Sequence, residues 1–443
     1  MATVTRWTPQ GEVSIGRISH VREGDHSSFR FDNAYLSMPP ETRPLLGVFF
    51  LGRDGQPRQV TRSTSTRVHP WFANLLPEGP LRENVARQYG FHVERDYPLL
   101  LVLGADLPGA VVVRPDPEDH WVTSSDAPDE AHIATDANRL KFSLAGMQLK
   151  FSAVQRASGG LTIPAGGLGG QWIVKLPSAQ FEGVPENEFD MMRLARESGF
   201  SVPDIGLTRI ADIDGLPEGM RQAGHAYVVR RFDRTGSDGR VHMEDFAQVF
   251  GLYPGRKYET IGYASIAAAI AQVVGEEGVE EFIARLVFIA AIGNGDMHAK
   301  NWSLLYPDGQ SPQLAPPYDM LSTLPYISGR ETLALSVAGS KQFEDFSLDR
   351  LKLLAQRAHI SERLVVTTAT RISERIWTAW THVRNELASP DFVRTHLDRH
   401  MEALPLFREV LGMPHVASRA SRRETRADDK RVDPPSSETF HIS

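Results

Sequence analysis

Short apolar runs separated by turn residues dominate the first quarter of the chain, over residues 11–113. Runs of this kind, bounded by Gly, Pro and Asp, predict strands, and Asp54-Gly55 between two of them predicts a hairpin. One short helix is expected to interrupt the strands, because Pro80 suits a first helical turn and apolar residues follow it at helical spacing. This part of the chain therefore predicts a mixed, strand-rich region.

From residue 140 the pattern changes to strand, turn and strand, followed by a glycine-rich loop and the apolar strand 172–177. Pro185 then opens a helix whose inward positions are Phe189, Met192 and two neighbouring apolar residues, and Gly199 closes it in the left-handed conformation. A further strand covers 225–233. The pattern predicts a small antiparallel sheet with one helix.

Beyond residue 262 the apolar positions recur mostly with the period of a helix, over 263–274, 279–293, 348–359 and 362–387. A strand-rich lobe thus precedes a helical one, and the expected fold class is α+β. Two segments lack sustained periodicity: the acidic, Pro-rich stretch 114–139, which predicts a linker, and the charged tail from Pro414, which predicts disorder. The expected division is an N-terminal subdomain (1–113), a linker (114–139), a nucleotide-binding region (140–260), a helical lobe (261–412) and a tail (413–443).

Composition and net charge exclude several classes of protein and of functional site. The chain has 443 residues and no cysteine, which excludes disulfides, thiolate metal sites and a cysteine nucleophile. Its formal net charge of −7 disfavours a protein that binds nucleic acid by itself. Neither a leader-like apolar segment near the start nor an 18-residue apolar window occurs, so we expect a cytoplasmic protein without a membrane segment.

The segment 293–306, GNGDMHAKNWSLLY, carries the clearest chemical signal. Asp296 is followed five residues later by Asn301, the spacing of the catalytic loop of protein kinases, in which the Asp accepts the hydroxyl proton and the Asn binds Mg²⁺. The alternative is that Asn294 and Asp296 only turn the chain after Gly293.

Two further features favour the kinase interpretation. Asp319 lies 18 residues after Asn301, behind a predicted hairpin, where a kinase places its second metal-binding carboxylate. Lys175 stands inside an apolar strand, where burial without an anion is costly, and Glu188, 13 residues later, is the carboxylate expected to pair with it. The alternative for Lys175 is an edge strand with the side chain in solvent.

The loop that binds the phosphates is less clearly marked. The run 166–170 has no GxGxxG register and is interpreted as a connector, whereas the turn 143–148 between two strand-like segments is better placed to offer N–H groups. No GxxxxGK[ST] motif occurs, which excludes a P-loop NTPase. His298 has no partner His at metal-site spacing, so a hydrogen bond that organises the loop is expected rather than a metal ligand.

Nine blocks of sequence in a fixed order resemble one known family. They are DHSSF (25–29), FANLLPEGPLRE (72–83), SLAGMQLK (143–150), IVKLP (173–177), NEFDMMRLARESG (187–199), RRFDR (230–234), HMEDFAQVFG (242–251), GNGDMHAKN (293–301) and YDMLST (318–323). The chain resembles HipA, the serine/threonine kinase toxin of bacterial type II toxin–antitoxin systems. The resemblance covers nearly all of residues 10–410 and implies a divergent two-lobed kinase fold behind an N-terminal subdomain.

The resemblance also implies roles for individual residues. Asp296 would be the catalytic Asp, Asn301 and Asp319 would bind Mg²⁺, and Lys175 would bind phosphate. The other implied ATP contacts are Ala145, Gly146, Met147, Gln148, Leu149, Lys150, Arg230, Arg231, Phe232, His298, Ala299, Lys300 and Tyr318. Ser143 matches a serine whose autophosphorylation silences the kinase. Arg230 stands where family hinges often have Glu, and Met147 replaces a usual Ala.

The function implied is an ATP- and Mg²⁺-dependent serine/threonine protein kinase that acts as a HipA-like toxin. The resemblance suggests an aminoacyl-tRNA synthetase as substrate, most often the glutamyl enzyme, and a small helix-turn-helix antitoxin of the HipB kind as partner, through which alone the protein would meet DNA. One alternative is a kinase-fold corepressor that mainly holds the antitoxin on its operator. Another is a small-molecule kinase on the same fold.

Overall fold

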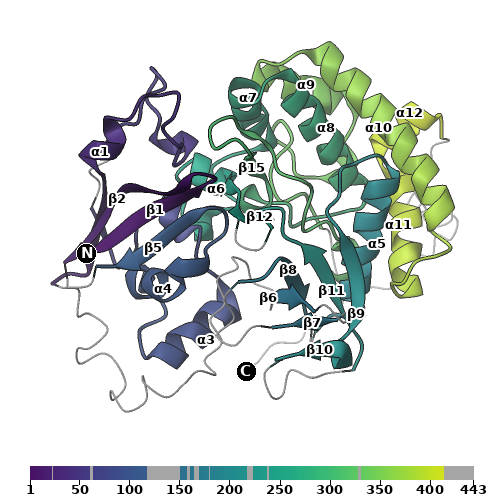
Figure 1. Ribbon diagram of the computed structural model, residues 1–443. Coiled ribbons are helices and arrows are strands. Elements are labelled where there is room, and N and C mark those ends of the chain that lie inside the picture. Colours follow the sequence, from purple (N-terminus) through teal and green to yellow (C-terminus); the bar gives the residue numbers. More distant parts are fainter. Residues whose placement is uncertain are drawn as a thin grey trace, which may run out of the picture.

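The computed structural model describes residues 1–21, 23–59, 63–116, 150–156, 160–163, 169–178, 180–216, 223–236, 239–327 and 331–413. Figure 1 shows a strand-rich N-terminal region on one side of the molecule and a helical region on the other, with a second sheet between them. Ser143, Ala145–Leu149, most of the predicted linker and the tail beyond Met413 lie outside the described residues.

The N-terminal region contains an antiparallel sheet of five strands in the order β4-β3-β2-β1-β5. Its strands are β1 (Ala2–Thr8), β2 (Gly11–Val21), β3 (His26–Phe31), β4 (Thr64–Ser65) and β5 (Val111–Pro115). The helices here are α1 (Asn33–Leu36), α2 (Pro70–Ala73), α3 (Gly79–Tyr89) and α4 (Asp96–Leu103). The helix predicted from Pro80 is α3, whereas α1, α2 and α4 were not predicted. Helix α4 was missed because its apolar run is buried almost all round and shows no period.

Two local expectations in this region need correction. Asp54-Gly55 does form a turn, with Gly55 at φ 73°, but its flanks pair only at the isolated bridge between Leu51 and Pro57. Pro57 has no N–H group and cannot extend the ladder. Strand β5 ends at Pro115, so it includes the first two residues of the stretch interpreted as aperiodic linker sequence.

The second sheet has six strands in the order β10-β7-β6-β8-β11-β9. They are β6 (Lys150–Gln155), β7 (Leu161–Thr162), β8 (Trp172–Lys175), β9 (Ile205–Arg209), β10 (Ile213–Asp214) and β11 (His225–Arg230). The sheet is antiparallel as predicted except for the pair β7–β10, which is parallel. Helix α5 (Val184–Glu197) has Pro185 in its first turn, and Gly199 follows its end at φ 97°. Phe189, expected inside, is only half-buried.

The helical region consists of α6 (Phe246–Val249), α7 (Tyr263–Val273), α8 (Glu276–Ala291), α9 (Leu348–Ala358), α10 (Glu362–Val383), α11 (Asp391–Ala403) and α12 (Pro405–Leu411). Two small sheets join it to the other regions. One consists of β12 (Arg234–Thr235) and β13 (Gly239–Arg240), and the other of β14 (His242–Asp245), β15 (Ser303–Tyr306) and β16 (Gln313–Leu314). All four stretches predicted to be helical are helical. Among the described helices none is both long and apolar enough to cross a membrane.

Two hydrophobic clusters form the interior, and β11 contributes to both. Tyr227 and Val229 face the cluster of the helical region, whereas Ala226 and Val228 face the cluster of the N-terminal region. This alternation is the period of a strand buried on both faces. The second sheet is therefore packed between the two cores, which positions its strand ends next to both regions.

Candidate active site

A cavity of about 230 Å³ opens where the second sheet, the N-terminal region and the loops after α8 and β16 meet. Its lining includes twelve of the predicted site residues: Lys150, Lys175, Glu188, Arg230, Arg231, Phe232, Asp296, His298, Lys300, Asn301, Tyr318 and Asp319. Ala299 is fully buried and does not line the cavity. The structure thus brings together most of the predicted site residues that lie inside the described ranges.

Lys175 is the cation at the end of β8. The strand lies between β6 and β11 and the side chain is only 4 % exposed, so the edge-strand alternative is wrong. Its Nζ atom lies 2.5 Å from Oε1 of Glu188 and also donates to Oδ1 of Asp319. Burial by itself would lower the pKa of Lys175, but the charges of the two carboxylates outweigh it and raise the pKa. Lys175 is therefore charged and has one N–H bond left for a further acceptor.

Asp296 follows α8 in a loop that a buried asparagine organises. Gly293, at φ 61°, turns the chain. Asn294 is fully buried; its Oδ1 accepts from the N–H of Asp296 at 2.8 Å, and its Nδ2 donates to the carbonyl of Asp319 at 3.2 Å. Asn294 thus performs the turning role, while the carboxylate of Asp296 remains part of the cavity wall.

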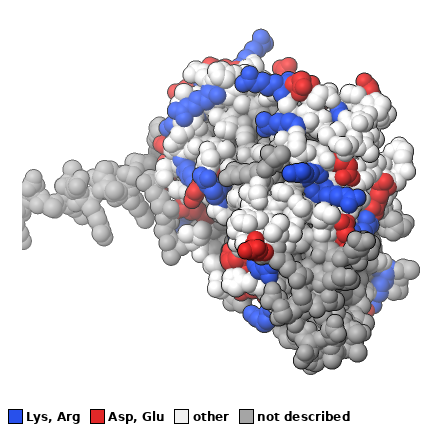
Figure 2. All heavy atoms as spheres, turned by 90° about the vertical axis from the view of Figure 1, so that its left-hand side faces the viewer, with Lys and Arg blue, Asp and Glu red and all other residues white. Residues whose placement is uncertain are grey.

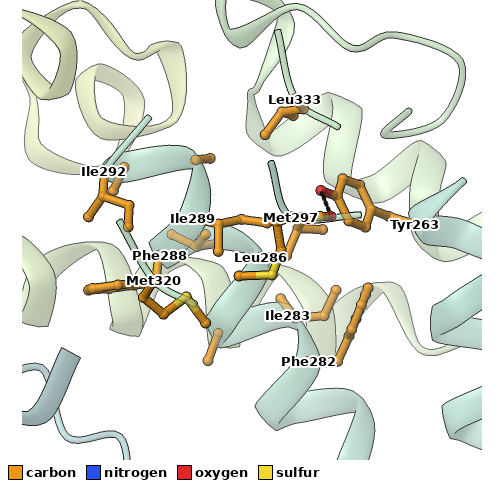
Figure 3. Packing of buried hydrophobic residues seen from close by; sticks show 14 of the residues in the cluster. Tyr263, Phe282, Ile283, Leu286, Phe288, Ile289, Ile292, Met297, Met320 and Leu333 are labelled. Carbon is orange, nitrogen blue, oxygen red and sulfur yellow. Dashed lines mark hydrogen bonds between the residues drawn. The ribbon is translucent and has the colours of Figure 1, made fainter. Parts of the chain in front are cut away.

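The loop that carries Asp296 packs against the hydrophobic core of the helical region. Met297 follows Asp296 and Met320 follows Asp319 in the chain. Both methionines are almost completely buried, and Figure 3 shows them among the apolar side chains of α8. The hydroxyl of Tyr263 donates to the carbonyl of Met297 at 2.9 Å. Each loop therefore has one methionine in the core beside an aspartate that lines the cavity.

The donor set in the cavity fits a magnesium ion. Nδ2 of Asn301 donates to the carbonyl of Asp296 at 2.9 Å, which leaves its Oδ1 as the available ligand atom. Burial opposes ionisation of Asp319, but Lys175 and Lys150 outweigh it, so the pKa of Asp319 lies well below the ordinary value. One carboxylate and one amide oxygen form a hard set, and Mg²⁺ bound this way completes its shell with phosphate oxygens and water.

The backbone of His298 belongs to the turn of the Asp296 loop: its main-chain N–H donates to the carbonyl of Asp296 at 2.8 Å. The residue is 6 % exposed, and its imidazole Nδ1 has no hydrogen-bond partner among the described residues, so the organising hydrogen bond expected from the sequence is not observed at that atom. Burial, reinforced by the charges of Lys257 and Lys300, lowers the pKa of His298 to about 3, so the ring is neutral. A neutral ring adds no charge beside a nucleotide. By contrast, burial raises the pKa of Asp296 above its ordinary value, which suits a group that must take up a proton.

The predicted hinge segment contacts the cavity unevenly. The guanidinium of Arg231 points into a buried ion cluster with Asp233, and the N–H of Arg231 donates to the carbonyl of Gln171 at 2.7 Å. Arg230 extends to the surface beside Asp204. The ring of Phe232 lies 5.7 Å from that of Tyr318. Within this segment Phe232 therefore offers the flat apolar surface that an adenine ring requires.

Glu78, Lys257 and Tyr258 are among the residues of the site that sequence reasoning missed. Glu78, at the start of α3, accepts from Lys257 Nζ at 2.9 Å and from Lys300 Nζ at 2.7 Å. Burial opposes ionisation of Glu78, but the two lysines outweigh it and lower its pKa to about 2. Tyr258 donates to Oδ1 of Asp296. Glu78 belongs to one of the blocks that carry the family resemblance, yet no local pattern pairs it with lysines 179 and 222 residues away.

Models of protein families match most of the chain. The model described as HipA N-terminal domain matches residues 10–114, and the HipA-like C-terminal domain matches residues 142–380. The chain belongs to the HipA family. Two relatives from Sinorhizobium fredii bear the names "Putative kinase Y4dM" and "Putative kinase Y4mE". The first is 44 % identical over 89 % of this chain and 96 % of its own length, and the second is 28 % identical over 81 % and 86 %.

A solved structure confirms the fold. HipA of Shewanella oneidensis MR-1, determined in complex with HipB and operator DNA, has a TM-score of 0.68 with 20 % identity, covering 94 % of this chain and 100 % of that protein. At this identity the likeness concerns the fold alone. The expected α+β HipA fold is confirmed, and the relatives place the chain in a family of kinases.

Proposed function

We propose that this protein is an ATP- and Mg²⁺-dependent kinase that phosphorylates a serine or threonine hydroxyl of another protein. The observation that carries the proposal is the single cavity lined by the Lys175–Glu188 pair, Asp296, Asn301 and Asp319. These residues match the parts that phosphoryl transfer requires: a phosphate-binding cation, a base and hard oxygen ligands.

The transfer assigns a task to each group. The acceptor oxygen forms a bond to the γ-phosphorus, the bond from that phosphorus to the β–γ bridging oxygen breaks, and ADP leaves. Asp296 takes the proton of the acceptor hydroxyl. Lys175 and Lys150 face the phosphates. Asn301 and Asp319 would hold Mg²⁺, which would supply positive charge for the phosphate oxygens.

Replacing the base tests this proposal. Asp296→Asn should reduce transfer of radiolabel from ATP to protein about 10²- to 10⁴-fold, the usual contribution of a general base. Calorimetry should find ATP affinity nearly unchanged, because Asp296 is not assigned to the nucleotide. Asp349→Asn, whose side chain is exposed on α9, is the matched control. Near-normal transfer by Asp296→Asn would refute the assignment.

We further propose that the protein acts as a toxin together with a helix-turn-helix antitoxin. The family and the HipA–HipB–DNA complex of Shewanella oneidensis support such a partner. Basic and acidic side chains lie side by side over the described part of the face in Figure 2, a distribution that fits contact with DNA through a partner. Copurification should recover a helix-turn-helix protein, and phosphoproteomics on cells with and without Asp296→Asn should identify the substrate, for which the family favours glutamyl-tRNA synthetase.

The alternative function, a corepressor that binds the antitoxin on its operator, makes a different prediction. A pure corepressor would repress equally well with and without Asp296, and no cellular protein would gain phosphate. The intact set of Lys175, Asp296, Asn301 and Asp319 in one cavity favours catalysis.

Self-silencing at Ser143 completes the proposal. Ser143 lies seven residues before Lys150, which lines the cavity. Phosphate there would add about −1.5 to −2 charges beside a site for an anionic nucleotide. Mass spectrometry should find phosphate on Ser143 of active protein and none on Asp296→Asn protein made alone. Ser143→Ala should bind ATP and lack the mark.

A further inference from the structure

Tyr258 contacts the catalytic carboxylate from outside the catalytic loop. It follows the short helical turn Pro254–Arg256, and its hydroxyl donates to Oδ1 of Asp296. The ring also packs edge-on against His298, with 4.9 Å between the ring centroids. Because 38 % of Tyr258 is exposed, the residue stands at the edge of the site rather than in its core.

Three contacts hold the backbone of this residue and its neighbour in place. The carbonyl of Lys257 accepts from the N–H of Ala299 at 3.2 Å, and Lys257 Nζ is bound by Glu78 at 2.9 Å. Lys341 Nζ donates to the carbonyl of Tyr258 at 3.3 Å. The catalytic loop and the N-terminal region together therefore determine where the phenol lies.

A fixed donor on one carboxylate oxygen has a chemical consequence. The terminal torsion of an aspartate is broad and nearly two-fold, so an unrestrained carboxylate samples many orientations. Burial raises the pKa of Tyr258, and its hydroxyl stays protonated and acts only as a donor to Asp296. With Oδ1 engaged in this way, Oδ2 remains to accept the proton of the acceptor hydroxyl.

We propose that Tyr258 is a positioning residue for phosphoryl transfer: its hydroxyl holds the carboxylate of Asp296 in the orientation that receives the acceptor proton. The inference rests on the proposed kinase function. It adds a residue from outside the catalytic loop to that reaction, and it links the reaction to the N-terminal region through Lys257 and Glu78.

The test removes one oxygen atom. Tyr258→Phe in the full-length protein keeps the ring contact with His298 and should lower kcat about ten-fold, while KM for ATP changes less than two-fold. Tyr35→Phe is the matched control, because it removes a hydroxyl that donates to Pro44 at 3.0 Å inside the N-terminal region. Its kcat should equal that of the wild type.

A second measurement does not depend on transfer. In thermal unfolding of the single and double variants, the shift caused by Tyr258→Phe should be larger in the wild-type background than in Asp296→Ala, because the contact is already absent there. Equal shifts in both backgrounds would overturn the contact. Unchanged kcat in Tyr258→Phe would overturn its role, and faster transfer would show that Tyr258 competes with the acceptor. The wild-type protein could transfer no phosphate while Tyr258→Phe still shifts the unfolding temperature more in the wild-type background than in Asp296→Ala. That result would overturn the proposed function and with it the role of Tyr258 in transfer.

Discussion

Two buried ion clusters contribute residues to the lining of the cavity, and they are built differently. In the first, which we call the closed cluster, Arg231 and Arg234 share the carboxylates of Asp233 and Asp106. The N–H of Gly109 also donates to Asp233, at 2.8 Å. Nearly every oxygen and N–H group of this cluster has a protein partner, and it joins the N-terminal region to β11.

The open cluster consists of Lys175, Glu188 and Asp319. Lys175 uses two of its three N–H bonds, and the side chain of Asp319 is 24 % exposed at the cavity. Asp319 also stands at φ 54°, a conformation that costs energy for most residues but that Asp tolerates. A cluster with a spare donor and an accessible carboxylate can bind a ligand, whereas a saturated one can only hold the fold together.

Arg231 illustrates the difference. It was expected to contact the nucleotide, but its side chain, which is 1 % exposed, is fully used in the closed cluster. A charged side chain next to a binding site is therefore available to a ligand only where its partners leave donors or acceptors free.

The largest effect is expected in the open cluster. Asp319→Asn, which tolerates the left-handed backbone, should reduce phosphoryl transfer at least ~10³-fold, because the proposed Mg²⁺ site would lose its carboxylate ligand. Calorimetry should show that Mg²⁺ no longer increases ATP affinity. Unfolding in urea should shift by less than it does for Asp233→Asn, since Lys175 keeps Glu188 as partner. Strong destabilisation with intact Mg²⁺-dependent binding would erase the distinction between the clusters.

In the closed cluster we expect the opposite pattern. Asp233→Asn keeps the shape of the side chain but leaves two buried arginines with the single charge of Asp106, which should cost about 3 kcal/mol of stability. Urea unfolding measures the loss, and transfer at temperatures where the variant is folded should fall less than about three-fold. A variant that is stable but inactive would place Asp233 in the active site.

The ion pairs of Glu78 should make the stability of the protein depend on pH. The folded pKa of Glu78, about 2, lies below the ordinary value of 4.5 for a glutamate, so its stabilising effect is complete above about pH 4.5 and is lost as the pH falls toward 2. The difference in unfolding free energy between wild type and Glu78→Gln should be on the order of 2 kcal/mol at pH 7 and should shrink by pH 3. Urea titrations at several pH values measure it. A difference independent of pH would show that the charge of Glu78 contributes nothing.

The smallest effect is expected at the surface. Arg371 on α10 pairs with Glu280 on α8, and both side chains are more than one-third exposed. Arg371→Ala should change stability by less than about 1 kcal/mol, because water screens the pair. Urea unfolding of Arg371→Ala and of Asp233→Asn under the same conditions measures the two losses of unfolding free energy. A loss as large as that of Asp233→Asn would show that burial does not decide the value of an ion pair in this protein.

Much of the fold could be predicted from local pattern. The helices α7 to α10 follow from apolar residues at helical spacing, and α5 follows from Pro185 and Gly199 at its two ends. Helix α4 could not be found in this way, because a segment buried on nearly all sides has no polar face to reveal its period. The domain boundaries and the roles of the site residues stay predictions.

The sequence by itself determined the spacing of Lys175 with Glu188, and that of Asp296 with Asn301 and Asp319, because short loops and regular elements place residues that are near one another in the chain. Only the tertiary structure decided that Glu78 binds two lysines, that Tyr258 reaches Asp296, and that the guanidinium of Arg231 bonds Asp233. The physical reason is range. Periodicity and turn chemistry act over a few residues, whereas the contacts of Glu78 and the shared carboxylates of the closed cluster join segments more than 100 residues apart, and packing of the two cores selects them.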